Sequence, residues 1–363
     1  MAHLFQKTDP ISPRQKRKIR DILLIKMRYI GDTVLVTPLI DAIKAHIPHA
    51  RIHLLVNKSV EDIVVDHPSL YQVHVFDYGR TNRSLGYLFR FLRRLIQNRF
   101  QLVIDLTRND RSALITILSG ARYRLGYDGA IFPKNLVYTH TVPYYFGQVH
   151  TVDHHLSMGE LLGFHHASPH PRLPVSADRI GIVMQRLKQA GMRLDAPYAV
   201  IHPGARRWYK RWPEERFAEI GDRLFQSLNL QVVLSGGSKD AKTCRRIENL
   251  MTAPCVNTAG RLPLADLPAL IRQAGILIGN DSSPIHIATA VNTPSVSLFG
   301  PTQWEAWRPR RRHDIAIAAV FPCRPCGHSR PDCPHGSDYC MNVITVDRVW
   351  AAVKSIIEQL QES

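Results

Sequence analysis

Short runs of consecutive apolar residues alternate along this chain with longer segments in which apolar residues recur every three or four positions. The runs are typical of fully buried strands, and the periodic segments are typical of amphipathic helices. The strands predicted for the first half cover residues 22–26, 52–56, 73–76 and 102–106. Helical spacing follows over residues 34–43 and 83–100. Strands that alternate with helices of this length predict a doubly wound parallel sheet.

The second half repeats the pattern without repeating the sequence. Its predicted strands cover residues 198–202, 232–234, 276–278 and 295–299, and its predicted helices cover 213–228, 264–273 and 346–360. A proline-rich stretch, SPHPRLP, separates the halves. We therefore expect an α/β protein with two Rossmann-like domains facing a cleft. The expected boundaries are a basic tail (1–19), a first domain (20–168), a linker (169–176), a second domain (177–345) and a C-terminal helix (346–363).

The composition of the chain limits the classes of partner that we expect for it. Its 363 residues include 47 Lys and Arg against 30 Asp and Glu, a net charge of +17. Such a balance favours anionic partners: nucleic acid, phospholipid headgroups or a phosphorylated substrate. We find no RNA-binding or helix-turn-helix motif, so nucleic acid is not the expected partner. The arginine-rich segment 83–100 is either a solvated helix face or a point of peripheral attachment to an anionic membrane.

One turn carries the clearest chemical signal. The strand at 276–278 runs through Gly279, Asn280 and Asp281 into a helix start at which Ser282 or Ser283 would supply a capping hydroxyl. A helix that begins at the carboxyl end of a strand aims backbone N–H groups and a positive dipole end at the crevice, which suits a phosphate. An ordinary strand–helix–strand crossover with no ligand is the alternative.

Three other strand ends carry candidate groups. Gly31 and Asp32 follow the first strand, where the carboxylate could act as a general base or only cap the helix. The loop over 202–213 includes Gly204, Arg206 and Lys210, and suits a diphosphate unless it is merely a solvated basic loop. Asp240 follows another strand and could accept hydrogen bonds from ribose hydroxyls or act as a cap. The G-x-G-x-x-G fingerprint is missing from the first turn, which argues against a dehydrogenase.

Taken together, six segments resemble glycosyltransferase family 9, the bacterial heptosyltransferases of the lipopolysaccharide inner core. In family order they are ILLIKMRYIGDTVLVTPLI, FQLVIDLTRND with RLGYDG, HTVDHHL, IHPGARRWYKRWPEERFAEI, VVLSGGSKD and IGNDSSPIHIATAVNTPSVSLFGPT. They cover most of residues 20–305, and their details are most similar to heptosyltransferase III-type sequences. The resemblance implies a GT-B fold with an acceptor-side N-terminal domain and a C-terminal domain that binds the nucleotide sugar.

The resemblance also implies the reaction and the roles of residues. It implies transfer of L-glycero-D-manno-heptose from ADP-heptose to a lipid A-core acceptor, with inversion at the anomeric carbon. Asp32 matches the base, and Lys210 with the 280–286 turn matches the groups that hold the diphosphate. The residues that match or lie near donor-binding positions are Gly31, Gly204, Arg206, Asp240, Asn280, Asp281, Ser282, Ser283 and His286. Some family members carry hydroxyl residues where this chain has Gly204, Ala205 and Arg206. Arg206 or Arg207 would here replace the phosphate contacts of those hydroxyls.

Several expectations about partners and location follow. No cofactor is expected for the chemistry, and an oxocarbenium-like transition state is expected, as in glycoside cleavage. The sequence has no apolar run of membrane-spanning length and no apolar signal core at its start, so we expect a cytoplasmic protein. Its site of work would be the inner face of the inner membrane, in peripheral contact with the anionic surface. A different GT-B sugar-nucleotide enzyme, such as an epimerase, and a non-catalytic nucleotide or nucleic-acid binder are the alternatives.

Four cysteines gather in one predicted loop, 323–340. Cys323, Cys326, Cys333 and Cys340 have the spacing C-x₂-C-x₆-C-x₆-C. Four thiolates within a short segment are typical of a tetrahedral zinc site, which would be structural here. Reduced thiols that only pack, and disulfides, which a reducing compartment disfavours, are the alternatives.

Overall fold

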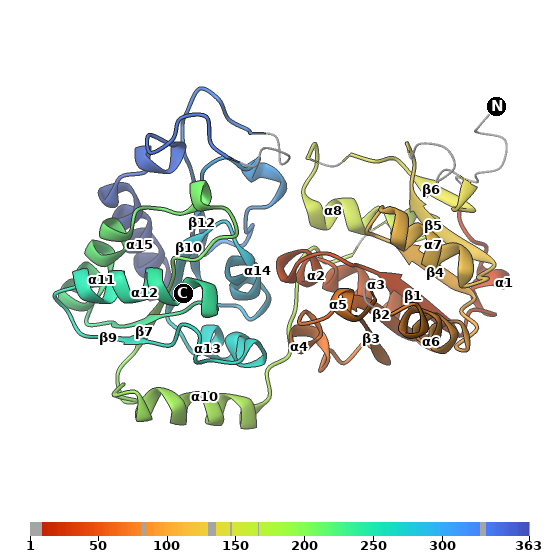
Figure 1. Cartoon of the computed structure of the whole chain (residues 1–363), viewed down its shortest axis with the longest axis horizontal. Helices are drawn as coiled ribbons and strands as arrows, with labels where there is room; N and C mark the ends of the chain where they lie inside the picture. The colour runs from red at the N-terminus through yellow and green to blue at the C-terminus, as the bar shows by residue number, and fades with distance from the viewer. Residues whose placement is uncertain are drawn as a thin grey trace. The chain divides into compact units, whose positions relative to one another are not determined.

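The structure is a computed structural model that describes residues 9–81, 84–129, 136–145, 147–165, 167–326 and 332–362. The chain divides into two compact units, Met1–Pro174 and Val175–Ser363, called the N-terminal and C-terminal units below. The division falls within the segment 169–176 that the sequence predicts as a linker. Each unit is a parallel sheet with helices on both faces (Figure 1).

Six strands of the described N-terminal unit form its sheet, in the order β3-β2-β1-β4-β5-β6. Their bounds are β1 Asp21–Ile25, β2 Arg51–Asn57, β3 Gln72–Phe76, β4 Leu102–Asp105, β5 Tyr123–Tyr127 and β6 His140–Val142. All neighbours are parallel, and Ile22 of β1 lies between Ile52 and Leu102 in register. The sequence predicts the first four strands and misses the last two. In β5 Arg124 interrupts the apolar run, and β6 is only three residues long.

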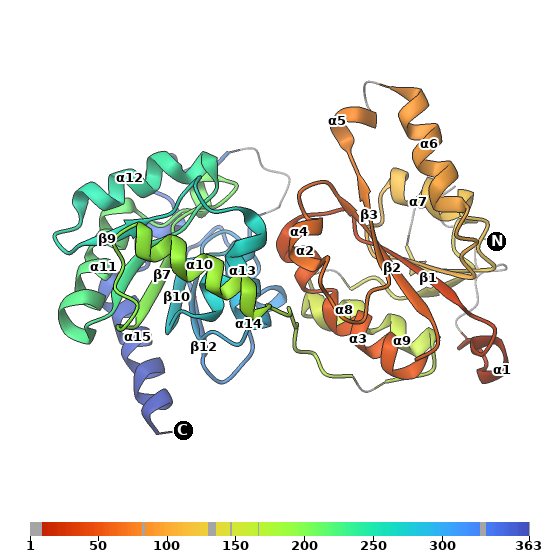
Figure 2. The ribbon, with the colours of Figure 1, turned by 90° about the horizontal axis from the view of Figure 1, so that it is seen from below.

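The helices of the N-terminal unit are α1 Pro13–Lys16, α2 Ile30–Val34, α3 Thr37–His46, α4 Glu61–Val64, α5 Tyr78–Thr81, α6 Leu85–Ile96, α7 Asp110–Leu118, α8 Thr151–Leu156 and α9 Met158–Leu161. Helices α6 and α7 lie on one face of the sheet, and α3, α8 and α9 lie on the other (Figure 2). The change of face follows from right-handed crossovers, because the strand order runs one way from β1 to β3 and the other way from β1 to β6.

The segment predicted as a basic tail is partly folded onto the N-terminal unit. Ser12 caps α1, and Ile11 and Ile19 are buried. The Ile11 backbone N–H donates to the Leu161 carbonyl oxygen at 2.8 Å, and Lys16 Nζ donates to the Leu162 carbonyl oxygen at the same distance. Residues 1–8 of the predicted tail lie outside the described residues.

The C-terminal unit has a second sheet of six described strands, in the order β12-β11-β10-β7-β8-β9. Their bounds are β7 Tyr198–His202, β8 Gln231–Leu234, β9 Cys255–Asn257, β10 Ile276–Asn280, β11 Ser295–Phe299 and β12 Asp314–Ala318. The sequence predicts β7, β8, β10 and β11, where apolar residues run together. It misses β9 and β12, whose residues are mostly half-buried at the two ends of the sheet.

The helices of the C-terminal unit are α10 Ala177–Gln189, η3 Trp208–Lys210, α11 Glu214–Leu228, η4 Ser238–Asp240, α12 Ala241–Leu250, η5 Leu264–Asp266, α13 Leu267–Arg272, α14 Ser283–Ala290, η6 Trp304–Ala306, η7 Cys340–Val343 and α15 Val346–Gln361. The faces are shared as in the first unit: α11, α12 and α15 cover one, and α10, α13 and α14 cover the other (Figure 1). Of the helices in the described residues, none is both long enough and apolar enough to cross a membrane.

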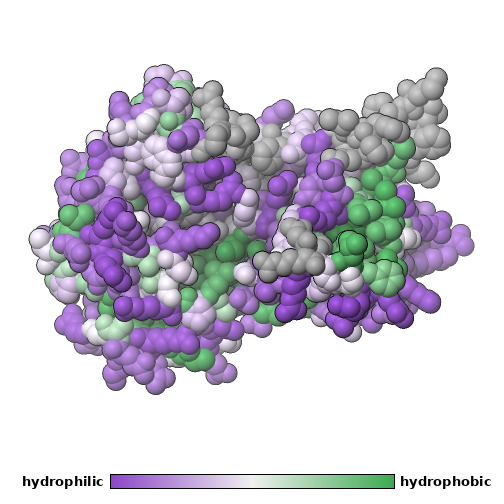
Figure 3. Space-filling model, in the orientation of Figure 1, coloured by the Kyte–Doolittle hydropathy of each residue, from purple (hydrophilic) through white to green (hydrophobic). Residues whose placement is uncertain are grey.

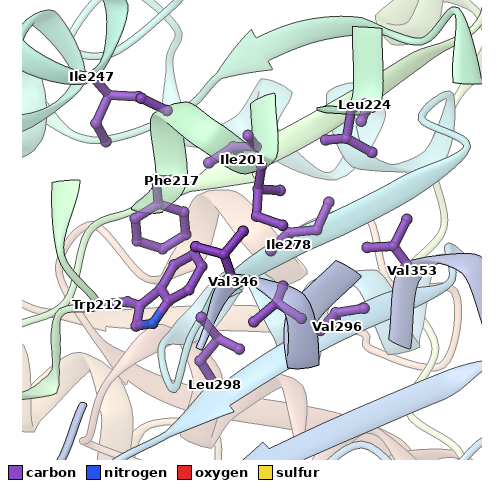
Figure 4. Packing of buried hydrophobic residues seen from close by; sticks show 14 of the residues in the cluster. Ile201, Trp212, Phe217, Leu224, Ile247, Ile278, Val296, Leu298, Val346 and Val353 are labelled. Carbon is purple, nitrogen blue, oxygen red and sulfur yellow. The ribbon is translucent and has the colours of Figure 1, made fainter. Parts of the chain in front are cut away.

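The core under α11 and α15 fixes the loop that precedes α11. Trp212 is buried, meets the Phe217 ring edge-on at 5.0 Å between centroids, and lies among residues of β7, β10, β11 and α15 (Figure 4). Its indole Nε1 donates to the Ile344 carbonyl oxygen at 2.8 Å. A buried Trp with its N–H satisfied contributes a large apolar area without a desolvation penalty. Trp212 therefore anchors the loop over residues 203–211 to the core.

Candidate functional site

The strand ends of the C-terminal unit bring the predicted donor-binding residues together. In a parallel sheet the carboxyl ends of all strands meet at one edge. At this edge, His202 ends β7, Ser235 follows β8 and Asn280 ends β10. The site is built from the loops that leave these ends.

Lys210 and Asp281 form the closest ion pair of this edge. The Lys210 Nζ atom lies 2.7 Å from Asp281 Oδ2, and the Thr302 hydroxyl donates to the same oxygen at 2.6 Å. The Lys210 side chain keeps 22% of its surface exposed, against 9% for Asp281. Asp281 is fixed by β10, while Lys210 is carried on η3. The ammonium is therefore held in place by a buried carboxylate and still reaches solvent.

The electrostatics favour an ionised Asp281. Burial acts to raise the pKa of this carboxyl, but the Lys210 charge and the hydrogen bonds from Lys210 and Thr302 lower it below its ordinary value. His286, one turn into α14, adds a smaller effect in the same direction. His286 is buried, and its ring centroid lies 6.3 Å from that of Trp307.

Asn280 ties two parts of the basic loop to the sheet. Its Oδ1 accepts from the Trp212 backbone N–H at 3.0 Å, and its Nδ2 donates to the Pro203 carbonyl oxygen at 2.7 Å. The side chain is fully buried. These two bonds set the path of the loop that carries Lys210. The donor-binding role of Asn280 stays a prediction.

Asp240 lies against the start of the same loop. Its Oδ2 accepts from the Gly237 backbone N–H at 3.0 Å, and its Oδ1 lies 3.8 Å from Arg211 Nη2. A β-carbon at Gly204 would come within 2.6 Å of the Asp240 carboxyl carbon, so a larger residue at 204 would displace this carboxylate. Beside them, burial lowers the pKa of His202 to about 4, and its Nδ1 lies 3.1 Å from the Ser235 hydroxyl.

The start of α14 differs from the expected cap. Within residues 280–290, all of which are described, Ser282 occupies the N-cap position but makes no side-chain bond to the helix. Its hydroxyl donates to the Asn280 carbonyl oxygen at 3.2 Å instead. Ser283 is the first helical residue, followed by Pro284. The prediction of a hydroxyl cap is therefore wrong for Ser282.

Arg206 completes the predicted residues of the C-terminal unit. Its side chain is exposed on the loop between Ala205 and η3. Arg211, farther along this loop, donates from Nε to the Ala205 carbonyl oxygen at 3.0 Å and so closes the loop on itself. The C-terminal unit thus gathers a basic loop, a buried acid and a helix start at one sheet edge.

Asp32 and Gly31 lie in the N-terminal unit, in the first turn of α2 at the carboxyl end of β1. Gly31 is buried, whereas the Asp32 side chain keeps 19% of its surface exposed. Asp32 Oδ1 lies 3.5 Å from Nζ of the buried Lys26. The carboxylate therefore reaches solvent while it lies beside a buried cation, and contact with solvent is what a general base needs to reach a substrate proton.

Sequence reasoning missed the groups behind Asp32. Lys26 Nζ lies 3.1 Å from His155 Nε2 and 3.4 Å from the Leu106 carbonyl oxygen. His155 Nδ1 lies 2.9 Å from the Tyr127 hydroxyl, which donates to the His154 carbonyl oxygen at 3.2 Å. Burial lowers the pKa of Lys26, and the Asp32 charge opposes this effect. The sequence held one sign of this cluster, because Lys26 ends a predicted strand that is otherwise apolar.

The acceptors around Lys26 match its donors in number. An ammonium has three N–H donors, and the Asp32 carboxylate, the Leu106 carbonyl and His155 Nε2 supply three acceptors. His155 can then carry its proton on Nδ1 and donate to Tyr127. Burial lowers the pKa of His155 well below its ordinary value, and the Lys26 charge acts in the same direction. The chain of contacts is consistent with a charged Lys26 beside a neutral His155.

The four cysteines of the C-terminal loop line one small cavity together with Tyr209 and Pro301. Cys323 Sγ and Cys326 Sγ lie 4.0 Å apart, about twice the length of a disulfide bond. In the described part of the chain, no three His, Cys, Asp or Glu side chains are arranged so that they would hold a metal ion. Residues 327–331 of the predicted loop lie outside the described residues. The zinc site stays a prediction.

Comparison with known proteins places the chain in a family. The sequence profile "Glycosyltransferase family 9 (heptosyltransferase)" matches residues 88–334. Lipopolysaccharide heptosyltransferase 3 of Escherichia coli K12 is 30% identical over 348 residues, which cover 92% of this chain and 97% of that protein. The expected similarity to heptosyltransferases of type III is thus confirmed.

Solved structures bear out the fold. The glycosyltransferase family 9 protein from Veillonella parvula superposes with a TM-score of 0.82 at 20% identity, covering 95% of this chain and 99% of that one. E. coli heptosyltransferase WaaC, solved with ADP-2-deoxy-2-fluoro heptose, gives a TM-score of 0.68 at 18% identity, with 92% and 99% covered. The predicted GT-B type of fold is confirmed. This chain therefore belongs to glycosyltransferase family 9, the heptosyltransferases, and is a glycosyltransferase.

Proposed function

We propose that this enzyme transfers L-glycero-D-manno-heptose from ADP-heptose to the inner core of lipopolysaccharide, with inversion at the anomeric carbon. The observation that carries the proposal is the Lys210–Asp281 pair at 2.7 Å beside the start of α14. A held ammonium and a positive helix end together suit the diphosphate of a nucleotide sugar. The solved WaaC complex with an ADP-heptose analogue and the similarity to heptosyltransferase 3 support the donor and the acceptor class.

In the proposed reaction Asp32 acts as the base. Its carboxylate accepts the proton of the acceptor hydroxyl, and the hydroxyl oxygen forms a bond to the anomeric carbon. The bond from that carbon to the phosphate oxygen breaks on the opposite face, and ADP leaves with the bonding electrons. Attack opposite to the leaving group inverts the configuration. Partial exposure of Asp32 supports this role, since the base must reach a substrate proton.

Lys210 and the C-terminal unit would meet the charge that develops on ADP. The Lys210 ammonium would contact the diphosphate, with Arg206 and the backbone N–H groups of Ser282 and Ser283 as further donors. Asp240 would accept from the ribose hydroxyls at the end of β8. His286 lies behind Asp281 and would support the orientation of this turn. The remaining predicted donor residues, Gly31, Gly204 and Asn280, would act by close packing and loop placement.

Partners and location belong to the same proposal. The acceptor would be a lipid A-core molecule, and the enzyme would work at the cytoplasmic side of the inner membrane in peripheral contact with its anionic surface. The net charge of +17 supports an anionic acceptor and an anionic surface. The proposed chemistry uses protein side chains and the two substrates, with no cofactor.

An ADP-release assay tests the proposal. The full chain is incubated with ADP-heptose and with a series of lipid A-core acceptors truncated at successive heptose positions. We expect ADP release that depends on one truncated acceptor, with a product whose anomeric configuration is inverted. Donor binding without release on any acceptor would exclude the inner-core acceptor. Failure to bind ADP-heptose, together with turnover of another sugar nucleotide, would exclude the donor.

A further inference from the structure

Helix α6 exposes apolar side chains that do not pack in the core of the N-terminal unit. Its inner side packs on the sheet through Leu88, Leu92 and the buried Leu95. Leu85 and Phe89, in contrast, keep 83% and 67% of their surface exposed, and Ile96 keeps 37%. Intervals of four and seven residues place these three on one stripe of the helix. The stripe is exposed at Leu85, Phe89 and Ile96, while Leu92 on the same side of the helix packs partly on the core.

The neighbouring helix extends this surface. Helix α7 contacts α6 and lies beside it on the same face of the sheet (Figure 2). Its last two turns expose Leu114, Ile117 and Leu118 at 50%, 51% and 40%. Figure 3 shows apolar side chains gathered on the face of the N-terminal unit that carries α7. We call the six residues Leu85, Phe89, Ile96, Leu114, Ile117 and Leu118 the α6–α7 face.

The charged side chains of the segment that contains α6 are all positive. Residues 78–104 contain six arginines and no aspartate or glutamate. On α6, Arg90, Arg93 and Arg94 are exposed, and Arg93, four residues after Phe89, lies beside the apolar stripe. Arg90 and Arg94 point to another side of the helix and line a groove of about 560 Å³ between α6 and β3. The nearest acids of the following segment are Asp105, which is fully buried, and Asp110, at the opposite end of α7 from Leu118.

We propose that the α6–α7 face docks the enzyme onto the surface of an anionic phospholipid bilayer. The apolar stripe would enter the boundary between headgroups and acyl chains, and the flanking guanidinium groups would bind lipid phosphates. A second copy of this chain fits the face less well, because a twofold contact would bring the arginines of both copies together. The inference rests on the peripheral membrane contact of the proposed function and names the surface that makes it; vesicle binding is measured apart from heptosyl transfer, so either can fail without the other.

Vesicle sedimentation with the full chain tests this inference. The probes are vesicles of phosphatidylcholine alone and of phosphatidylcholine mixed with phosphatidylglycerol. We expect binding to the mixed vesicles that weakens as salt rises, and much weaker binding to the neutral ones. Each arginine near an anionic surface changes the partition coefficient about fivefold, so Arg93→Gln should weaken binding by about this factor. Leu85→Ser with Phe89→Ser should also weaken it while thermal stability is retained.

Matched changes on the other unit serve as controls. Ile182 on α10 is 49% exposed, and Arg348 on α15 is exposed. Ile182→Ser and Arg348→Gln should leave vesicle binding unchanged. Equal binding to neutral vesicles, or equal losses in the controls and the α6 variants, would overturn the proposal. So would a concentration-dependent dimer in light scattering that Phe89→Ser abolishes while vesicle binding is absent, because the face would then join two copies.

Discussion

Lys210 Nζ and Asp281 Oδ2, which are 71 positions apart in the sequence, lie 2.7 Å from each other. The carboxylate also accepts from Thr302, so it is ionised and fixed before any ligand arrives. Fixed charges stabilise a transition state better than mobile ones because they need no reorganisation during the reaction. This pair is the basis of the first prediction.

Lys210→Met should lower kcat by about 10²–10³-fold, because one positioned donor to the leaving group is lost. The variant also leaves Asp281 buried without its cation, so ADP affinity should fall. Stopped-flow or single-turnover measurement of ADP release checks the rate, and calorimetry checks the affinity. Lys242→Met, on the exposed side of α12, is the matched control and should behave as the parent enzyme.

Asp32→Asn should lower transfer by about 10²–10⁴-fold while ADP binding is retained, because a single base contributes this much. Asp62→Asn is the control, since Asp62 is exposed in α4. Near-normal turnover of the Asp32 variant would contradict its assignment as the base.

Lys26 is expected to act on Asp32 as a positioning residue. Lys26→Met removes the cation that lies 3.5 Å from the Asp32 carboxylate, so kcat should fall while ADP affinity and thermal stability are retained. Lys26→Arg keeps the charge and should restore part of the rate. Lys58→Met, at an exposed site, should leave kcat unchanged. A loss of thermal stability that parallels the loss of rate would assign Lys26 to folding only.

Asn280→Asp should loosen the loop that carries Lys210. The substitution keeps the acceptor for the Trp212 N–H but loses the donor to the Pro203 carbonyl oxygen, where it places a second acceptor. Leaving a buried group unsatisfied costs about 1–3 kcal/mol of the free energy of unfolding. Urea unfolding measures this loss, and ADP affinity should fall with it. Asn98→Asp, on the segment after α6, is a half-buried comparison outside this site.

The stability of the chain should fall as the pH is lowered below about 6.5. Burial, followed by the neighbouring His53, lowers the pKa of His74 from 6.5 to about 4. Between these values the unfolded chain binds a proton that the folded chain does not. Stability is therefore lost as pH falls through this window, by up to about 1.4 kcal/mol per pH unit. His74→Gln should flatten this dependence in urea unfolding at several pH values, whereas His170→Gln, at an exposed site, should not.

Elemental analysis of the purified chain tests the predicted zinc site. A structural site would give one zinc for each chain, lost in Cys326→Ser and retained in Cys244→Ser, because Cys244 is a buried residue of α12 and not one of the four loop cysteines. Removal of zinc by a chelator should then lower the thermal stability. A metal-free chain of unchanged stability would leave the alternative in which the four thiols only pack around their cavity.

Much of the fold could be predicted from the sequence, because apolar runs and helical periods are local patterns. Eight of the strands were predicted, and most of them, including β1 and β10, are apolar on both faces of a buried sheet. The candidate turns at Asp32, Asp240 and Asp281 were found because each follows a predicted strand. The strand β9 was missed because it has only three residues, and β12 because Asp314 and alanines interrupt its apolar run.

Only the tertiary structure decided which of these residues contact one another. The periodicity of α6 makes Leu85 and Leu95 equally apolar, yet one is exposed and the other buried, because a period shows which residues share a face but not what covers it. The contacts of Asn280 with the Trp212 N–H and the Pro203 carbonyl oxygen could not be predicted from the sequence either. The pairing of Lys26 with His155 joins residues 129 positions apart, and such contacts depend on how the whole chain packs. The sequence alone thus determined the layers and the chemically active turns, while long-range packing decided the surroundings in which each side chain acts.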